Sequence, residues 1–232
     1  MAAAKELYER IWQEQSSLAP YKGGNLRVDL VAGLLPGGKR MLDLGCGDGV
    51  LGELVKDRFE EVVGADISEL ALAIARRRGL KACKVNVDEE PLPFPDGHFE
   101  CITCLDLIEH VFEPRTLVRE MARVLALNGA LFVAFPNMRY ILRIKELVAG
   151  RFPKTSGDLQ YAYDGGHLHY YTPEDVRRLL EEQCLAVTGE WGIVSPGIRD
   201  NYKYRLLRLL LPPGLRREFL SIEVVLGATR SQ

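Results

Sequence analysis

An acidic residue and alternating glycines follow an apolar segment early in the chain. Asp43 is followed by Gly45, Gly47 and Gly49, after which a helical pattern begins. Glycines with this spacing let the backbone approach a ligand closely and present amide groups to its polar end. A second acid, Asp66, closes the next predicted strand about twenty residues later, a spacing at which a carboxylate reaches ribose hydroxyls. The pattern predicts a site for a nucleoside that carries a polar tail.

The same segment also matches the dinucleotide-binding pattern G-x-G-x-x-G, at Gly47, Gly49 and Gly52. In NAD-binding proteins the first glycine of that pattern follows the strand directly. Here Asp43 and Gly45 occupy that place, and no GK[ST] triplet follows. The register argues against NAD, and an NAD-type oxidoreductase is kept only as a second alternative.

Strands and helices alternate around these glycines. The predicted strands are residues 40–44, 62–66, 80–85, 99–105 and 131–135. Helices are predicted from residue 50, from Ser68 as N-cap to Gly79, and from Pro114 to the pair at residues 128–129. This alternation predicts a parallel sheet covered on both faces, with ligands at the carboxyl ends of its strands. Gly45, Asp66 and Asp106 fall at such ends.

Other elements are predicted before and after this core. Helices are predicted at residues 5–15, 25–34, 138–149 and 173–183, the last with Thr172 as its N-cap. A short amphipathic segment at 204–211 ends at Pro212, and strands are predicted near 185–194 and 221–227. No composition break indicates a second domain. Residues 1–232 are therefore predicted to form one domain, with a core at about 38–136 and a substrate and lid region at about 137–220.

Composition narrows the class of protein. Apolar residues make up 47% of the 232 residues, charged residues make up 27%, and the net charge is −2, so neither nucleic acid nor an anionic membrane is an expected partner. No apolar run has membrane-spanning length. Cys101 and Cys104 lie three apart on a predicted strand and point to opposite faces, so they cannot share a metal or a disulfide. Cys83 and Cys184 are predicted small core residues, and we expect reduced thiols and a cytoplasmic location.

Four motifs follow one another within residues 43–129: DLGCGDG (43–49), LPFPDGHFE (92–100), LDLIEHV (105–111) and REMARVLALNG (119–129). Together they resemble class I S-adenosylmethionine-dependent methyltransferases. The later segments VAFPN (133–137), GRFPKT (150–155) and GHLHYYTPED (166–175) are similar to the MetW-like and UbiG-like (methyltransferase type 11) branch. The resemblance implies a Rossmann-like, seven-stranded, mostly parallel sheet with the last strand antiparallel, together with N-terminal helices and a helical or loop lid insertion.

The resemblance also implies the cofactor and the residues that bind it. S-adenosyl-L-methionine is the implied cofactor, with S-adenosyl-L-homocysteine as its product. Two parts of the implied site hold the cofactor's polar groups: Asp66 binds the ribose, and an acid with the glycine loop holds the aminocarboxypropyl end. That acid and loop are Asp43, Gly45, Cys46, Gly47 and Gly49. Ile67 is the apolar floor for the purine, and Leu105 and Asp106 complete the site at the end of the fourth strand. Adenine recognition has two candidates, Asn86 with Val87 or Asp88 with Glu89, and Asp88 is preferred because a carboxylate accepts more strongly.

Histidine is the natural base for a hydroxyl or amine acceptor near neutral pH. His110, at the carboxyl end of the fourth strand, is the first candidate, followed by His167 and His169. The last two share a face of extended backbone and Asp164 is close to them, but a third firm ligand is missing. No metal is therefore predicted.

The sequence predicts methyl transfer to an oxygen or nitrogen of a small-molecule acceptor by in-line displacement. The alternative is a non-catalytic MetW-like partner protein that keeps the cofactor fold. A homodimer and a pathway partner protein are both left open, and the identity of the acceptor is not determined.

Overall fold

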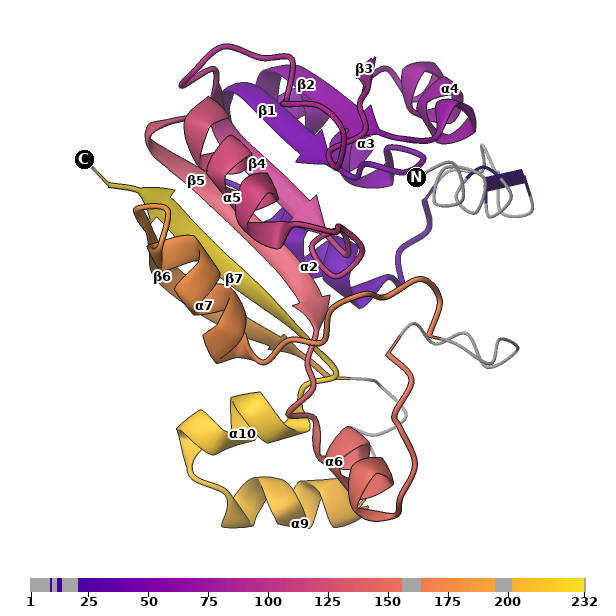
Figure 1. The fold of residues 1–232 in the computed structure, drawn as a ribbon, viewed down its shortest axis with the longest axis vertical. Helices are drawn as coiled ribbons and strands as arrows, with labels where there is room; N and C mark the ends of the chain where they lie inside the picture. Colours follow the sequence, from indigo (N-terminus) through magenta and orange to yellow (C-terminus); the bar gives the residue numbers. More distant parts are fainter. Residues whose placement is uncertain (1–8, 10–11, 14–20, 156–163, 195–201, 232) are drawn as a thin grey trace.

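A seven-stranded sheet forms the centre of the computed structural model (Figure 1), which describes residues 9, 12–13, 21–155, 164–194 and 202–231. The strand order is β3-β2-β1-β4-β5-β7-β6. The strands are β1 (Gly38–Leu44), β2 (Phe59–Asp66), β3 (Lys81–Lys84), β4 (Phe99–Leu105), β5 (Leu125–Pro136), β6 (Leu185–Ile193) and β7 (Glu223–Arg230). Only β7 runs antiparallel to its neighbours, which confirms the predicted Rossmann-like fold class.

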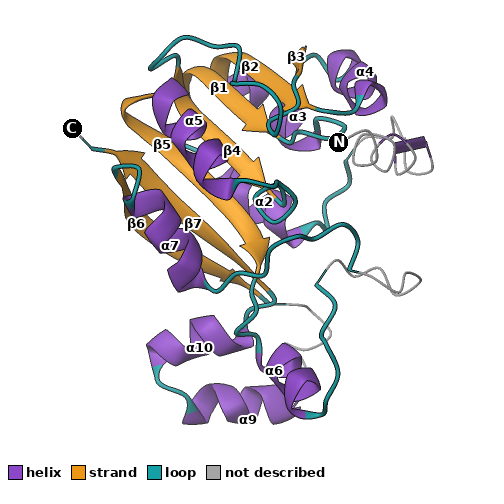
Figure 2. Cartoon of the chain, viewed as in Figure 1, coloured by secondary structure: helices purple, strands orange, loops and turns teal. Residues whose placement is uncertain are grey.

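Helices cover both faces of the sheet (Figure 2). The helices are α2 (Leu26–Leu34), α3 (Val50–Val55), α4 (Glu69–Arg77), α5 (Pro114–Val124), α6 (Ile141–Val148), α7 (Pro173–Glu181), α9 (Tyr202–Leu210) and α10 (Pro213–Leu220), with a short 3-10 turn η1 (Lys56–Arg58). Most of the helix predicted at residues 5–15 lies outside the described residues. Among the described residues, no helix combines the length and apolar character needed to cross a membrane.

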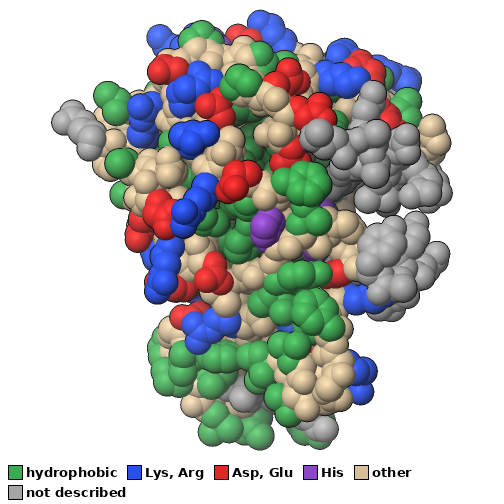
Figure 3. All heavy atoms as spheres, viewed as in Figure 1, with side chains coloured by type: hydrophobic (Ala, Val, Ile, Leu, Met, Phe, Trp, Pro, Cys, Tyr) green, Lys and Arg blue, Asp and Glu red, His purple; other side chains and the backbone are tan. Residues whose placement is uncertain are grey.

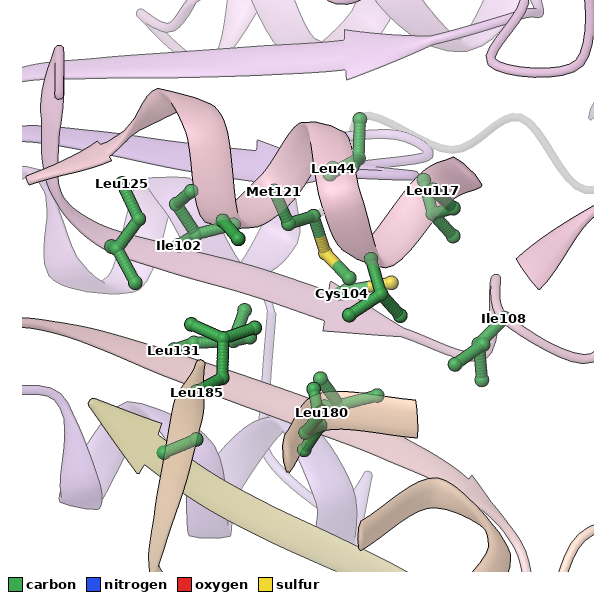
Figure 4. Close-up of a cluster of buried hydrophobic side chains, with 14 of the residues drawn as sticks. Leu44, Ile102, Cys104, Ile108, Leu117, Met121, Leu125, Leu131, Leu180 and Leu185 are labelled. Carbon is green, nitrogen blue, oxygen red and sulfur yellow. The ribbon is translucent and has the colours of Figure 1, made fainter. Parts of the chain in front are cut away.

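Two apolar layers hold the helices against the sheet. On one side α5 and α7 bury leucine and methionine side chains against β4 and β5 (Figure 4). On the other side α2, α3 and α4 pack on β1 and β2. Full burial of such a side chain contributes about 1.5–3 kcal/mol, so these contacts fix the sheet that carries the site. Cys101 and Cys104 fall in different layers, as their spacing on the strand predicted.

Local signals in the sequence explain several helix starts. The Ser68 side chain accepts from the Ala71 amide and caps α4. Thr172 and Asp175 form a reciprocal capping box at the start of α7. Both starts confirm the predicted N-caps, and α5 begins with Pro114 as expected.

Three predictions about elements were wrong. The helix that begins at Pro114 ends at Val124 and not at residues 128–129, because the chain enters β5 early, with Asn128 in a left-handed conformation (φ 61°). A separate helix, α10, follows Pro212, where the sequence predicted only the end of the amphipathic segment 204–211. Cys184 is exposed and not a core residue, since it lies in the turn between α7 and β6 with φ 58°.

Candidate functional site

The glycine loop between β1 and α3 adopts a conformation that requires glycine. Gly45, Gly47 and Gly49 have φ values of 74°, 51° and 78°, a region that side-chain-bearing residues rarely adopt. The amides of Gly45 and Cys46 donate to the Ala65 carbonyl at 2.8 and 3.1 Å, which ties the loop to β2. The loop therefore stands at the carboxyl end of the sheet beside Asp66.

A cavity of about 220 Å³ opens beside this loop. Its lining includes most of the residues predicted to bind the cofactor and one of the predicted bases. These lining residues are Gly45, Gly47, Asp66, Ile67, Asn86, Val87, Asp88, Asp106 and His110. The fold thus brings together residues from the ends of β1, β2, β3 and β4.

Four other predicted cofactor residues do not line the cavity. Asp43 is buried behind the loop, where its carboxylate accepts from the Thr103 hydroxyl at 2.7 Å, and burial raises its pKa to about 6. Cys46 is buried against Gly64. Gly49 caps α3, and a Cβ there would lie 2.9 Å from the Ala75 Cβ. Leu105 packs in the apolar layer under the sheet. Their positions indicate that they shape the loop from behind.

Asp66 occupies the position expected of a ribose-binding acid. Its carboxylate accepts from the amides of Gly47 and Ser68, both at 2.9 Å. Burial raises its pKa, and these backbone hydrogen bonds oppose that effect. The two amides hold the carboxylate in a fixed orientation at the edge of the cavity.

The two adenine candidates differ in how their oxygens are used. The Asn86 side-chain oxygen accepts from the Asp88 amide at 3.2 Å, so it braces the loop after β3. One oxygen of Asp88 accepts from the Phe112 amide at 2.8 Å. Asp88 lines the cavity and has a second carboxylate oxygen that accepts no hydrogen bond from a described residue, whereas the only oxygen of the Asn86 side chain already has a partner.

Two residues of the N-terminal segment reach this site, which the sequence analysis did not foresee. Trp12 lines the cavity, and a Cβ on Gly47 would lie 2.5 Å from its ring. Glu9 accepts from the Ser68 hydroxyl and the Glu69 amide, both at 3.0 Å. Trp12 lies on the apolar face of the helix predicted at residues 5–15, but the sequence does not indicate that it contacts Gly47. The cavity is below the ~300–1,000 Å³ usual for ligand pockets, so we expect Trp12 to move when a nucleoside enters.

Asp106 lies at the end of β4 in a buried charge cluster. It forms an ion pair with Arg27 of α2, which also contacts Glu223 at 3.2 Å. Asp106 has a positive φ of 51°, and its Oδ1 is buried without a hydrogen-bond partner among the described residues. Burial raises its pKa to about 7, although Arg27 opposes the shift. The cavity therefore contains a carboxyl group that a bound cation would stabilise in its charged form.

His110 and His167 lie together although 57 positions separate them in the sequence. Their ring centroids are 4.5 Å apart in an edge-to-face arrangement. His110 Nδ1 is 3.2 Å from the Gly166 carbonyl, which can only accept, so Nδ1 carries the hydrogen and Nε2 the lone pair. Burial and the neighbouring His167 lower the pKa of His110 to about 4. His110 is thus neutral near pH 7.

His167 is held from behind by a polar pair. The Thr155 hydroxyl donates to Asp164 at 2.5 Å, and His167 Nδ1 is 2.5 Å from that same hydroxyl oxygen. Burial lowers the pKa of His167, while Asp164 opposes this. His167 therefore supports His110 from the predicted lid region.

His169 lies apart from this pair. Its Nε2 is 2.9 Å from the Val111 carbonyl and its ring stacks on Tyr171 at 5.8 Å. These contacts join two loops and place the imidazole away from the cavity lining. The geometry favours a structural role for His169, although its spacing had suggested a third base.

Glu109 is a buried acid that the sequence analysis did not single out. Its side chain is 1% exposed, and neither carboxylate oxygen has a hydrogen-bond partner among the described residues. Burial and the nearby Asp106 raise its pKa well above the usual range. Ligand atoms of Glu109, His110 and His167 all lie within 4.8 Å of one another. These three side chains are a candidate set of metal ligands that differs from the His167, His169 and Asp164 considered from the sequence.

Comparisons with known proteins agree with this geometry. Residues 42–133 match the methyltransferase domain family. A ubiquinone biosynthesis O-methyltransferase of Pseudomonas aeruginosa (strain LESB58) is 35% identical over 218 residues, covering 88% of this chain and 89% of that protein. The protein of the same name from Alkalilimnicola ehrlichii is 30% identical over 207 residues, covering 84% and 81%.

Solved structures share the fold at lower identity. A SAM-dependent methyltransferase from Archaeoglobus fulgidus superposes with a TM-score of 0.63 at 18% identity, covering 88% of this chain and 96% of that one. The [4+2]-cyclase SpnF also superposes with a TM-score of 0.63, at 21% identity and with 94% and 86% coverage. The fold alone therefore does not determine the reaction. One family is indicated by the ordered motifs, by the match over most of the length of the O-methyltransferase relatives and by the cavity at the glycine loop. The chain belongs to the class I S-adenosylmethionine-dependent methyltransferases.

Proposed function

We propose that the protein transfers a methyl group from S-adenosylmethionine to a hydroxyl oxygen of a small aromatic acceptor, with His110 as the base. The observation that carries the proposal is the position of the His110 imidazole on the lining of the cavity beside the glycine loop. Burial lowers the pKa of this imidazole, which keeps it neutral near pH 7. The relatives named ubiquinone biosynthesis O-methyltransferase support oxygen over nitrogen as the acceptor atom.

The cavity suits the proposed cofactor. Asp66 and Asp88 offer carboxylate oxygens for the ribose and the adenine amino group, and Gly47 leaves room where a Cβ would collide with Trp12. The unpartnered Oδ1 of Asp106 suits the amino group of the methionine portion. When bound, the cofactor supplies a methyl group on a sulfonium, which is already a strong electrophile.

The protein then has to position the acceptor and remove its proton. The Nε2 lone pair of His110 accepts the hydroxyl hydrogen, while the Nδ1–H donates to the Gly166 carbonyl and fixes the ring. His167 contacts the His110 ring edge to face and is itself held by the Thr155 hydroxyl. Holding two reactants in line and excluding water is worth about 7–11 kcal/mol of barrier in well-oriented systems.

The cluster of Glu109, His110 and His167 supports a second chemistry for the same acceptor. A divalent cation on these three side chains would lower the hydroxyl pKa directly, and it would also satisfy the two unpartnered oxygens of Glu109. Activity that survives EDTA unchanged supports proton removal by His110 alone. Activity lost in EDTA and restored by Mg²⁺ or Zn²⁺, but not in a Glu109→Gln variant, supports the metal.

Adenine recognition can be assigned by a ligand that lacks the amino group. We expect Asp88→Ala to weaken S-adenosylhomocysteine binding about tenfold or more, because a hydrogen bond to a charged group is worth ~1.5–3 kcal/mol. S-inosylhomocysteine, which carries an oxygen at that position, should lose little affinity in the same variant. Asn86→Ala should retain the preference for adenine. A preference lost in Asn86→Ala and retained in Asp88→Ala would reverse the assignment.

Cofactor affinity should depend on pH through Asp106. Its pKa of about 7 leaves it partly protonated in the empty site, and the positive charge of the cofactor favours the ionised form. Affinity for S-adenosylmethionine should fall about tenfold per pH unit below pH 7 and be flat above it. Calorimetry between pH 5.5 and 8.5 measures this slope. Asp106→Asn, which tolerates the positive φ, should remove it, and a flat wild-type profile would contradict the prediction.

The function itself is tested by single-turnover transfer from labelled S-adenosylmethionine. The acceptors are a catechol, its mono-O-methyl ether and the corresponding aniline. We expect transfer to the phenolic hydroxyls and none to the amine. Tight binding of S-adenosylhomocysteine without transfer to any of the three would support the non-catalytic partner alternative.

A further inference from the structure

A second cavity, of about 660 Å³, lies between α2, the end of β6 and the helix pair α9–α10. No described residue lines both this cavity and the cofactor cavity. The pair α9–α10 lies at the end of the molecule opposite α4 (Figure 1). The volume falls in the ~300–1,000 Å³ range of small-molecule pockets. This cavity is therefore large enough to hold a ligand other than the cofactor.

The lining of this cavity is apolar on one side. Leu26 and Leu30 of α2, Ile193 of β6 and Leu220 of α10 contribute aliphatic surface, and the buried Tyr204 adds a ring. An elongated apolar group is the kind of ligand that such a wall binds.

The lining also includes three arginines, Arg208, Arg216 and Arg217. Arg208 forms no ion pair or hydrogen bond with any described residue. Arg216 donates from Nε to the Leu211 carbonyl at 2.6 Å. Arg217 is 4.0 Å from Glu190, which already pairs with Arg177 at 3.0 Å. Three arginines thus line the cavity, and among the described residues Glu190 is the one acid that forms an ion pair with any of them.

The surrounding surface has the same character. Residues 202–220 contain five basic residues and one acid, Glu218, although the whole chain has a net charge of −2. Glu218 is already paired with Arg139. Leu209 and Leu210 are 76% and 72% exposed next to the cavity, and hydrophobic side chains gather at this end of the molecule (Figure 3). Two copies of the chain would bring like charges together here, so an anionic ligand fits better than self-association.

We propose that this cavity binds a single-chain anionic amphiphile, with its carboxylate or phosphate head on Arg208, Arg216 and Arg217. The aliphatic tail lies along Leu26, Leu30 and Leu220. Arginine is suited to such heads because its planar group makes paired hydrogen bonds to carboxylate and phosphate. The site is independent of the acceptor of the methyl transfer.

Calorimetric titration of the full chain with laurate, below the concentration at which laurate forms micelles, tests the proposal. Affinity should rise about tenfold from octanoate to decanoate, since each buried methylene contributes a factor of about three to four. Dodecyl maltoside, which has the tail without the charge, and inorganic phosphate, which has the charge without the tail, should bind at least tenfold more weakly. A dodecyl phosphate arm distinguishes a phosphate head from a carboxylate head.

Arg208→Glu should weaken laurate binding at least tenfold, because it reverses a charge at the head position. Arg77→Glu on α4 is the matched control, since Arg77 is also an exposed helix residue but lies far from the cavity. Both variants should bind S-adenosylhomocysteine as the wild type does. Equal binding of laurate and dodecyl maltoside, or an unchanged laurate affinity in Arg208→Glu, would overturn the proposal. Binding to anionic vesicles without binding of monomeric laurate would also overturn it, in favour of a surface contact.

Discussion

Replacing Asp66 with alanine should weaken the binding of S-adenosylhomocysteine by about 100-fold or more. The carboxylate is held by two backbone amides at 2.9 Å and lines the cavity at the end of β2. Two hydrogen bonds from ribose hydroxyls to a charged acceptor are each worth ~1.5–3 kcal/mol. Their combined loss exceeds the ~2.8 kcal/mol that corresponds to 100-fold. Isothermal titration calorimetry measures the change directly.

The control for this variant must remove a charge from the same region without touching the cavity. Asp48 lies in the glycine loop, pairs with Arg78 at 3.0 Å and does not line the cavity. Asp48→Asn should therefore keep its affinity within about threefold. Asp66→Ala also leaves the amides of Gly47 and Ser68 without a partner, so its thermal unfolding must be followed alongside. A folded Asp66→Ala protein with nearly normal affinity would remove Asp66 from the cofactor site.

Replacing His110 with glutamine should lower the rate of methyl transfer by about 100-fold or more, because general base catalysis typically contributes 10²–10⁴-fold. Single-turnover measurement at saturating cofactor isolates this step from product release. The affinity for S-adenosylhomocysteine should change only a few fold, since glutamine keeps much of the shape of the cavity wall. A loss of affinity equal to the loss of rate would indicate that His110 only supports the cavity.

The other two histidines provide matched comparisons. His167→Gln should have a smaller effect on the rate, because His167 contacts His110 and acts through it. His169→Gln should leave the rate within a few fold, since His169 contacts the Val111 carbonyl and Tyr171. If His169→Gln were the variant with the largest effect on rate, the assignment of the base would be wrong.

The pH dependence of the transfer rate separates His110 from an ordinary histidine. Its pKa of about 4 means that protonation removes the base only well below the usual value of 6.5. At saturating cofactor, the rate should therefore stay flat as the pH falls from 8 to about 6. A decline centred near 6.5 would show a solvated histidine as the base. Titration of Asp106 does not affect this measurement, because it changes the affinity for the cofactor and the cofactor is saturating.

The sequence was sufficient for the parts of the protein that depend on local rules. Alternating apolar runs and caps such as Ser68 and Thr172 predicted the order of strands and helices, because capping and periodicity act over a few neighbouring residues. The glycine loop and Asp66 could be recognised because a tight turn and the length of a β-α-β unit fix their spacing. The exposed Cys184 and the early end of α5 were missed, since packing against distant strands decides them.

The sequence by itself determined the family, its cofactor and the mostly parallel sheet, because these follow from motifs and periodicity among neighbouring residues. Only the tertiary structure decided which side chains face the cavity. It placed Asp43 behind the loop, joined Arg27 to Asp106, and brought Glu109 and His110 to His167. The second cavity likewise forms from α2, β6 and α10, and α2 lies far from the other two in the chain. Such contacts depend on how helices and loops pack across the sheet, and no spacing within the sequence encodes that packing.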